Sequence, residues 1–171
     1  MTRAAFLSLS MVLLTACETP PPTAMSRPDA RTVNQLDASG GPSASGAVRI
    51  LFGRTFERYS FHAVMLPDGT ARGEAEFHDV TAGVSGHIDI NCLNVVGNTA
   101  TLSGIVTRTS DPTLEGFQGI FQVVDNGEGA KSPPDFASLI NFYAVGTGVD
   151  CTVPAEYDLV PIEEGNVQVE P

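Results

Sequence analysis

Apolar and polar residues alternate with a period of two over most of the chain after residue 46. The clearest case is residues 71–78, ARGEAEFH, where small or apolar positions alternate with charged or polar ones. Successive side chains of a β-strand point to opposite faces of a sheet, so this stretch predicts a strand with one buried face and one face in water. The 3.6-residue period of an amphipathic helix is absent from this part of the chain.

Further alternating segments are separated by turn residues such as Pro67-Asp68-Gly69 and Gly97-Asn98. The expected strands lie at about 48–52, 59–65, 71–78, 88–95, 100–106, 117–123, 136–143 and 167–169. The apolar parity switches at Leu93, which predicts a β-bulge or a strand corner. Residues 136–143 are apolar on both faces, which is typical of a central strand. The pattern predicts an all-β fold, either an antiparallel sandwich or a partly closed barrel of about eight strands.

The N-terminus has the order of a secretory signal. Its apolar run Ala4–Leu14 has about eleven residues, which is shorter than the roughly 20 that a membrane-spanning helix needs. The segment Leu14-Thr15-Ala16-Cys17 resembles the lipobox of bacterial lipoprotein precursors, which implies removal of residues 1–16 and lipidation of Cys17, with palmitate as a labelling precursor. The alternatives are an ordinary cleaved signal with an incidental cysteine and a buried N-terminal helix, which the prolines at 20–22 oppose.

These features divide the chain into a signal peptide (1–16), a lipidated Cys17 with a disordered linker (17–46) and a β domain (47–171). The expected location is the bacterial cell envelope, and the expected partner is the membrane, reached through the lipid. Glu18 replaces the Asp that retains enteric lipoproteins at the inner membrane, which favours the outer membrane where the source has one. The formal net charge of −11 argues against nucleic acid as a partner.

Two cysteines remain when Cys17 carries the lipid. An even pair in an oxidising compartment predicts a disulfide between Cys92 and Cys151. Closing a loop of about sixty residues contributes ~4 kcal/mol in the chain-entropy model. Two separate buried thiols are the alternative, and no further cysteine completes a zinc pattern.

We expect no metal or other cofactor, although two groups of residues are candidate metal ligands. The first is an acidic loop in which Asp125, Glu128 and Asp135 offer oxygens to calcium. Its spacing does not match an EF-hand. A plain hairpin loop, with a turn at Asn126-Gly127, is the alternative interpretation.

The second candidate lies on the outer face of the third and fourth expected strands. Matching their apolar parity places His78 opposite His87 and Glu76 opposite Asp89. Two imidazoles and two carboxylates are ligands that zinc accepts. The same reasoning places Arg58 opposite His78, which disfavours a cation, so we expect solvated surface histidines here and keep the zinc site as the alternative.

No nucleophile elbow, phosphate loop or dinucleotide fingerprint is present. We therefore expect a non-enzymatic β domain with a binding or structural role. The alternatives are a carrier that holds a small apolar ligand inside the curved sheet, and a metal-dependent activity at the histidine and carboxylate cluster. An open interior would favour the carrier, and a close-packed one would count against it.

Several short segments of the folded part carry a second resemblance. They are Tyr59-Ser60-Phe61-His62-Ala63, Asp68-Gly69-Thr70, residues 92–98 (CLNVVGN), residues 124–129 (VDNGEG) with Pro133-Pro134-Asp135, and residues 165–169 (GNVQV). Together they resemble a β-rich domain that recurs in secreted bacterial proteins of unknown function. The resemblance implies a β fold and brings no activity and no catalytic residue.

Overall fold

The computed structural model describes residues 41–129, 131–147 and 149–171, and within them the fold is all-β, as predicted. The predicted signal peptide, Cys17 and most of the predicted linker lie outside the described residues. The strands are β1 Ser43–Phe52, β2 Thr55–Met65, β3 Ala71–Asp79, β4 Val84–Val96, β5 Thr99–Thr109, β6 Gln118–Val124, β7 Phe136–Ala137, β8 Asn141–Tyr143, β9 Val160–Pro161 and β10 Glu164–Glu170, with a 3-10 turn η1 Pro112–Leu114 after β5.

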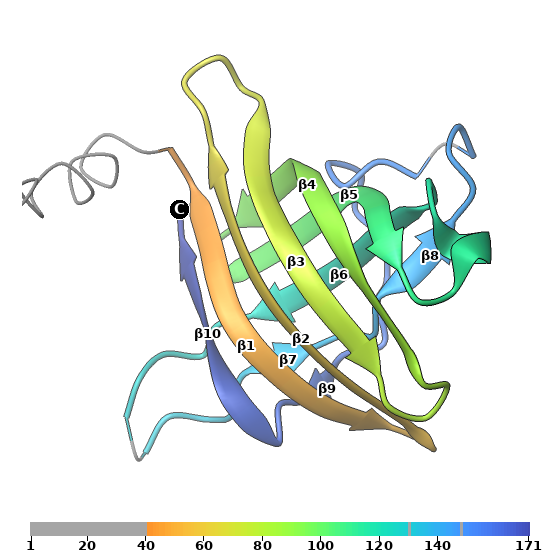
Figure 1. Ribbon diagram of the computed structural model, residues 1–171. Helices are drawn as coiled ribbons and strands as arrows, with labels where there is room; N and C mark the ends of the chain where they lie inside the picture. Colours follow the sequence, from red (N-terminus) through yellow and green to blue (C-terminus); the bar gives the residue numbers. More distant parts are fainter. Residues whose placement is uncertain (1–40, 130, 148) are drawn as a thin grey trace, which may run out of the picture.

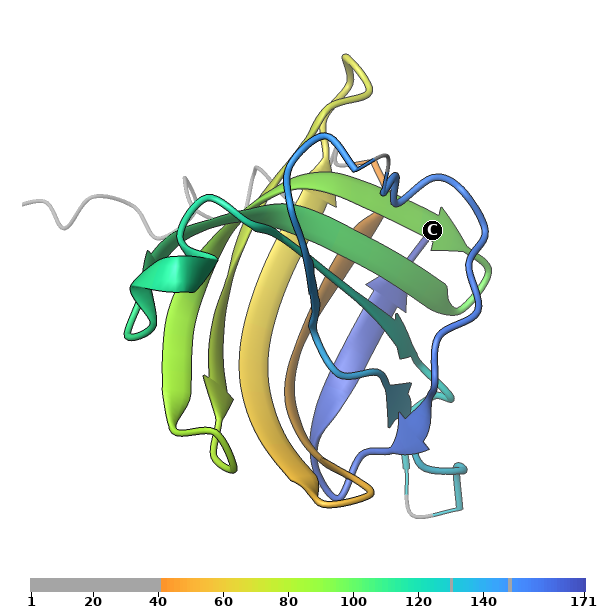
Figure 2. The same ribbon diagram turned by 90° about the vertical axis from the view of Figure 1, so that its right-hand side faces the viewer.

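All ten strands belong to one antiparallel sheet in the order β10-β1-β2-β3-β4-β5-β6-β7-β9, with β8 also paired to β6. The sheet curves until it forms two layers (Figure 1 and Figure 2). One layer holds β10, β1, β2, β3 and the first part of β4, and the other holds the rest of β4 with β5, β6, β7 and β9. The sheet remains open, with β10 and β9 at its ends.

The corner between the layers is a bulge in β4. Pairing with β3 ends at Ile90, and the register against β5 shifts between Ile90 and Cys92. An extra residue in one strand bends it and increases its twist. The predicted bulge is therefore confirmed, and the parity switch at Leu93 is its trace in the sequence.

The inner faces of both layers meet in a close-packed core. It comprises Ala44, Val48, Ile50, Tyr59, Phe61, Ala63, Ala75, Phe77, Ile88, Ile90, Leu93, Ala100, Leu102, Val106, Phe121, Val123, Ala137, Ile140, Val167 and Val169. Phe121 is fully buried, and its ring centroid lies 5.0 Å from that of Tyr59 and 5.3 Å from that of Phe61. Packed aromatic side chains thus occupy the interior that a carrier of an apolar ligand would need to keep open.

The sheet begins earlier than predicted, because β1 starts at Ser43 and takes in four residues assigned to the linker. Ala44 is buried against the core. Gly46 lies so close to β10 that an added Cβ would stand 2.6 Å from the Asn166 carbonyl oxygen. The small residues that suggest a linker in the sequence are the ones that allow this close strand pairing.

The predicted central strand at 136–143 is wrong. Within this stretch only β7 and β8 pair with β6, and residues 138–140 between them keep a single backbone bond to β6, from the Ser138 amide to the Gln122 carbonyl. The Ser138 hydroxyl accepts the Gln122 amide, and the Ser138 carbonyl accepts the Tyr59 hydroxyl at 2.8 Å. Bonds to side chains replace the rest of the ladder here, which explains why this apolar run does not form one strand.

The predicted disulfide is confirmed. Cys92 lies just after the bulge, and Cys151 lies in the segment between β8 and β9, which crosses the outside of the β4–β5 layer (Figure 2). Their Cα atoms are 6.1 Å apart and 59 residues apart in sequence. Within the described residues, no helix is long and apolar enough to cross a membrane.

Candidate functional site

A hollow of about 690 Å³ lies on the outer face of the layer formed by β10, β1, β2 and β3. Its lining comprises Ala47, Val48, Arg49, Phe56, Arg58, Tyr59, Ser60, Glu76, Phe77, His78, Glu164 and Gly165. The hollow exists because Ala47 and Ser60, which face each other across β1 and β2, leave space between larger neighbours.

Ala47 and Ser60 form the floor of the hollow. A row of charged and polar side chains borders this floor. Glu164, Arg49, Arg58 and His78 occupy facing positions on β10, β1, β2 and β3, one on each strand. Residues at facing positions on one side of a sheet have neighbouring side chains. We call Arg49, Arg58 and His78 the cationic row, after its two arginines; the predicted pairing of Arg58 with His78 is confirmed.

The cationic row is held by specific contacts. Arg58 donates from Nε and Nη2 to His78 Nδ1, at 3.2 and 2.9 Å. His78 then accepts on Nδ1, so its ring proton lies on Nε2. Arg49 lies over the Phe56 ring at 4.8 Å and forms an ion pair with Glu164. Its Nε atom is buried and has no hydrogen-bond acceptor among the described residues.

The charge of this row is only partly compensated. Glu164 balances Arg49, whereas no carboxylate oxygen of the described residues lies within 4.0 Å of the Arg58 guanidinium. Two arginines therefore face each other across β1 and β2, and their single counter-charge, Glu164, lies on β10 on the far side of Arg49. Like charges at facing positions destabilise a sheet, so this pair has an electrostatic cost.

The second group on this face is centred on His87 of β4. Its Nδ1 lies 2.6 Å from Glu76 Oε1, and its Nε2 lies 2.9 Å from Asp89 Oδ1. Arg108 also approaches Glu76, at 3.5 Å. The His87 side chain is only 9 % exposed, so the expectation of solvated histidines is wrong for this residue.

The predicted zinc arrangement does not form, because the register of β3 and β4 differs by two residues from the expected one. Ala75, not Phe77, pairs with Ile88, and His78 faces Ser85 instead of His87. Gly86 faces Phe77, and a Cβ on it would stand 2.7 Å from the ring, so the ring fills the space above this glycine. Glu76 and Asp89 lie at opposite nitrogens of the His87 ring, where they cannot share one metal ion with it.

The acidic loop accepts hydrogen bonds from the backbone of the edge strand β10. Asp135 Oδ2 accepts the Val167 amide at 3.1 Å, and Asp125 Oδ2 accepts the Val169 amide at 3.0 Å. Both amides belong to β10, the first strand of the sheet. Free N–H groups at a sheet edge invite pairing with other chains, and here two carboxylates occupy them.

The other oxygens of Asp125 and Asp135 and one oxygen of Glu128 also have partners. Asp135 Oδ1 accepts the Asn126 amide at 2.8 Å, and Asp125 Oδ1 accepts the Gly127 amide at 2.7 Å. Glu128 Oε1 accepts from the Asn166 side chain at 2.7 Å. Backbone donors point into the loop at the oxygens that calcium would need, which favours the structural role over the metal site.

Glu57 is a buried acid that the sequence reasoning missed. It lies on the inner face of β2, is 4 % exposed, and accepts the Ile140 amide at 3.2 Å. Burial raises the pKa of its carboxyl from 4.5 to about 8; the Ile140 bond opposes this shift, and the charge of Asp79 adds to it. The alternation in the sequence indicates this position, because Glu57 is in phase with Tyr59 and Phe61 on the apolar side of the strand.

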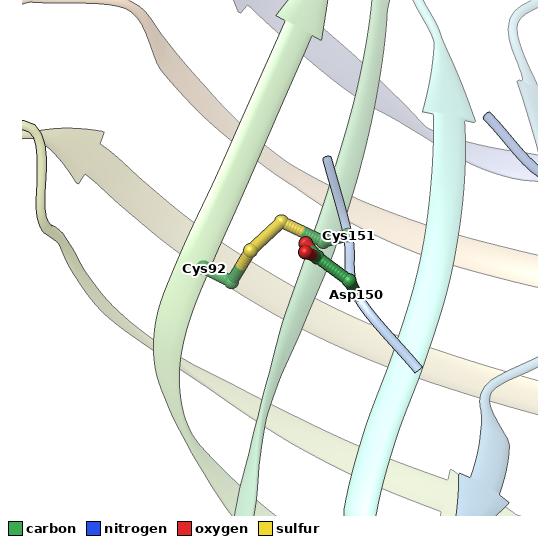
Figure 3. Close-up of side chains that lie close together, drawn as sticks. All are labelled: Cys92, Asp150 and Cys151. Atoms are coloured by element: carbon green, nitrogen blue, oxygen red, sulfur yellow. A yellow bond between two sulfur atoms is a disulfide. The ribbon is translucent and has the colours of Figure 1, made fainter. Parts of the chain in front are cut away.

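One further cluster surrounds the disulfide, where the Asp150 carboxylate lies near the sulfurs of Cys92 and Cys151 (Figure 3). The sulfurs are bonded to each other. Asp150 accepts the amide and the hydroxyl of Thr152, both at 2.8 Å, and these bonds lower the pKa of its carboxyl. Sulfur binds metals as thiolate, so the closed disulfide provides no thiolate ligand.

Comparison of the chain with protein-family models, curated proteins and solved structures gives no match. The lipobox and the resemblance to a β-rich domain of secreted proteins stay predictions.

Proposed function

We propose that this chain is a lipid-anchored domain of the bacterial cell envelope, and that it binds a ligand in its outer-face hollow without transforming it. The observation that carries the binding role is the contrast between the two sides of the sheet. The inner side is filled by packed side chains, whereas the outer side has a hollow of about 690 Å³. Concave sites of this size hold small molecules.

Anchoring is supported by the lipobox and by the disulfide. A Cys92–Cys151 bond is compatible with an oxidising compartment such as the one outside the cytoplasmic membrane. The chain between Cys17 and β1 has the composition of a flexible linker with an average span of about 30 Å. Such a linker keeps the domain near the bilayer without fixing its orientation.

Binding is favoured over catalysis by the way the titratable groups near the hollow are occupied. His87 has a carboxylate at each ring nitrogen, so no free nitrogen is left to take a proton from a nucleophile. His78 Nδ1 is occupied by Arg58. A general base needs a lone pair directed at the reacting group, whereas the Nδ1 lone pair of His78 and both ring nitrogens of His87 are directed at protein partners.

Metabolic labelling tests the anchor. Labelled palmitate should enter the full chain in its source cells and should be absent from Cys17→Ser. The matched control is Cys92→Ser combined with Cys151→Ser, which removes the same atoms elsewhere and should keep the label. Label that persists in Cys17→Ser would show that the lipid is not on this residue.

Native mass spectrometry tests the hollow. The full chain, purified from the membranes of its source in neutral detergent, should retain a small molecule. Ser60→Trp fills the floor of the hollow and should lose it, whereas His62→Trp, one position further along the same face of β2, should keep it. The binding role is wrong if the unmodified chain retains nothing or if Ser60→Trp retains the same molecule.

A further inference from the structure

We infer that the outer-face hollow takes a small organic anion, with a carboxylate or phosphate group between Arg49 and Arg58 and a ring on the floor made by Ala47 and Ser60. The inference rests on the proposed function and specifies the ligand of the same site. Four observations support it: the facing arginines, their unused donors, the shape of the floor, and the acidic surroundings.

The facing arginines give the sign of the ligand. The chain has 20 acidic and 9 basic residues, yet it places Arg49 and Arg58 at facing positions on neighbouring strands. Their mutual repulsion is unfavourable in the absence of a bound anion. One anionic group between them would replace repulsion by two attractions, and guanidinium groups suit the planar or tetrahedral oxygens of carboxylate and phosphate.

The donors that the protein leaves unused point to oxygen as the ligand atom. Arg58 uses Nε and Nη2 on His78, which leaves Nη1 without a protein acceptor among the described residues. The ring of His78 adds a donor at Nε2. The buried Nε of Arg49 also lacks an acceptor, an unfavourable state that rearrangement around an incoming oxygen would relieve.

The floor suits a ring. Ala47 and Ser60 are small, and the larger residues Arg49, Phe56 and Arg58 are among the lining around them. Arg49 is held over Phe56 at 4.8 Å, so the wall beside the floor is fixed and partly aromatic. A preformed wall reduces the ordering cost of binding a flat group.

The surroundings restrict the size of the anion. Glu76 and Glu164 line the same hollow, and the whole chain has a net charge of −11. A polyanion such as nucleic acid would meet these carboxylates beyond the arginines, where like charges repel it. A compact ligand with one anionic group avoids them.

Ligand-observed fluorine NMR tests the inference on the full lipidated chain in neutral detergent, with protein-free micelles as the blank. The probes are 4-fluorobenzoate, 4-fluorophenyl phosphate and the uncharged 4-fluorobenzamide. We expect at least one of the anions to bind about tenfold or more tightly than the amide, because only an anion meets two guanidinium groups. Comparison of the two anions identifies carboxylate or phosphate as the preferred group.

The decisive variant is Arg58→Gln, which should weaken binding of the preferred anion about tenfold and leave the amide unchanged. The matched control Arg72→Gln, on the outer face of β3 and outside the hollow, should change neither. The inference is overturned by equal binding of anion and amide, by an unchanged affinity in Arg58→Gln, or by no binding at roughly 10 mM probe, where millimolar affinity would register. The retained-molecule experiment with Ser60→Trp is independent, so a neutral ligand found there would preserve the binding role while the anion inference fails.

Discussion

The acidic loop and the cationic row are both charged clusters next to β10, yet they use their charges in opposite ways. In the loop, both oxygens of Asp125 and both oxygens of Asp135 accept backbone amides. In the cationic row, Arg58 lacks a carboxylate partner among the described residues, and a buried nitrogen of Arg49 lacks an acceptor. One cluster is satisfied by the protein itself, and the other is not.

This difference separates a structural cluster from a candidate binding site. A buried polar group without a partner is costly, so folded proteins pair nearly all of them. Charges that remain uncompensated on a rigid sheet reduce stability, and such cost is common at functional sites. By this criterion the acidic loop, which looks like a metal site in the sequence, belongs to the scaffold, and the cationic row is the better site.

The largest expected effect comes from breaking the satisfied cluster. Asp135→Ala removes two charge-assisted bonds and leaves the amides of Asn126 and Val167 without partners. We expect a loss of about 3–6 kcal/mol in the free energy of unfolding, measured by urea denaturation. Asp158→Ala, at an exposed loop position, is the control and should change stability by less than about 0.5 kcal/mol. Similar small losses in both variants would mean that the loop does not hold β10.

Glu57 is a buried carboxyl that accepts one backbone amide, whereas the aspartates of the acidic loop each accept two. Its pKa is raised in the folded state, so the folded protein favours the neutral acid, and this contribution is complete below pH 4.5 and is lost as the pH rises to about 8. We expect a fall of roughly 4 kcal/mol over this window from this group.

Chemical denaturation at a series of pH values measures this fall, and Glu57→Gln supplies the reference. The amide keeps the shape and cannot ionise, so the difference in stability between the two proteins should grow in favour of Glu57→Gln as the pH rises from 4.5 to 8. A constant difference across this range would show that Glu57 titrates like an exposed acid.

A smaller effect is expected from Arg58→Gln in the absence of ligand. The substitution removes a repulsive charge opposite Arg49 and the bonds to the half-buried His78. We expect the free energy of unfolding to stay the same or to rise by up to about 0.5 kcal/mol, as measured by urea denaturation. A loss above about 2 kcal/mol would place Arg58 with the structural residues and weaken the contrast between the two clusters.

The smallest expected effect is that of a chelator. The oxygens of Asp125 and Asp135 already accept backbone amides, so addition and removal of calcium should leave the melting temperature unchanged. Magnesium at the same ionic strength is the control for general screening. A rise with calcium alone, abolished by Glu128→Gln, would show that the loop opens to take the ion.

The faces of the strands were predictable because side-chain direction alternates strictly along an extended chain. The alternation of Tyr59 and Phe61 with polar residues separates the two faces of β2, and the short turn at Pro67-Asp68-Gly69 fixes its register against β3, so the facing of Arg58 and His78 followed. The same rule places Glu57 inside the core, because it is in phase with the apolar residues Tyr59 and Phe61.

The register of β3 and β4 was less predictable. A shift of two residues preserves the apolar face, so the alternation cannot distinguish the two registers. The difference depends on Phe77 filling the space above Gly86, which is a matter of packing between strands. This small shift decides whether His87 faces His78 or Glu76. It therefore decides whether the outer face has two histidines that zinc could bind, or one histidine held between two carboxylates.

The all-β class, the two faces of most strands, the bulge near Leu93 and the cysteine pair could be predicted from the residues alone, because each depends on local alternation or on simple counting. Which charges are satisfied depends on the folded arrangement. Asp125 and Asp135 reach β10 across more than 30 residues of chain, and Arg49 and Arg58 face each other only because their strands pair in one register. Hydrogen-bond partners are set by distances in space, and the order of residues along the chain does not specify those distances.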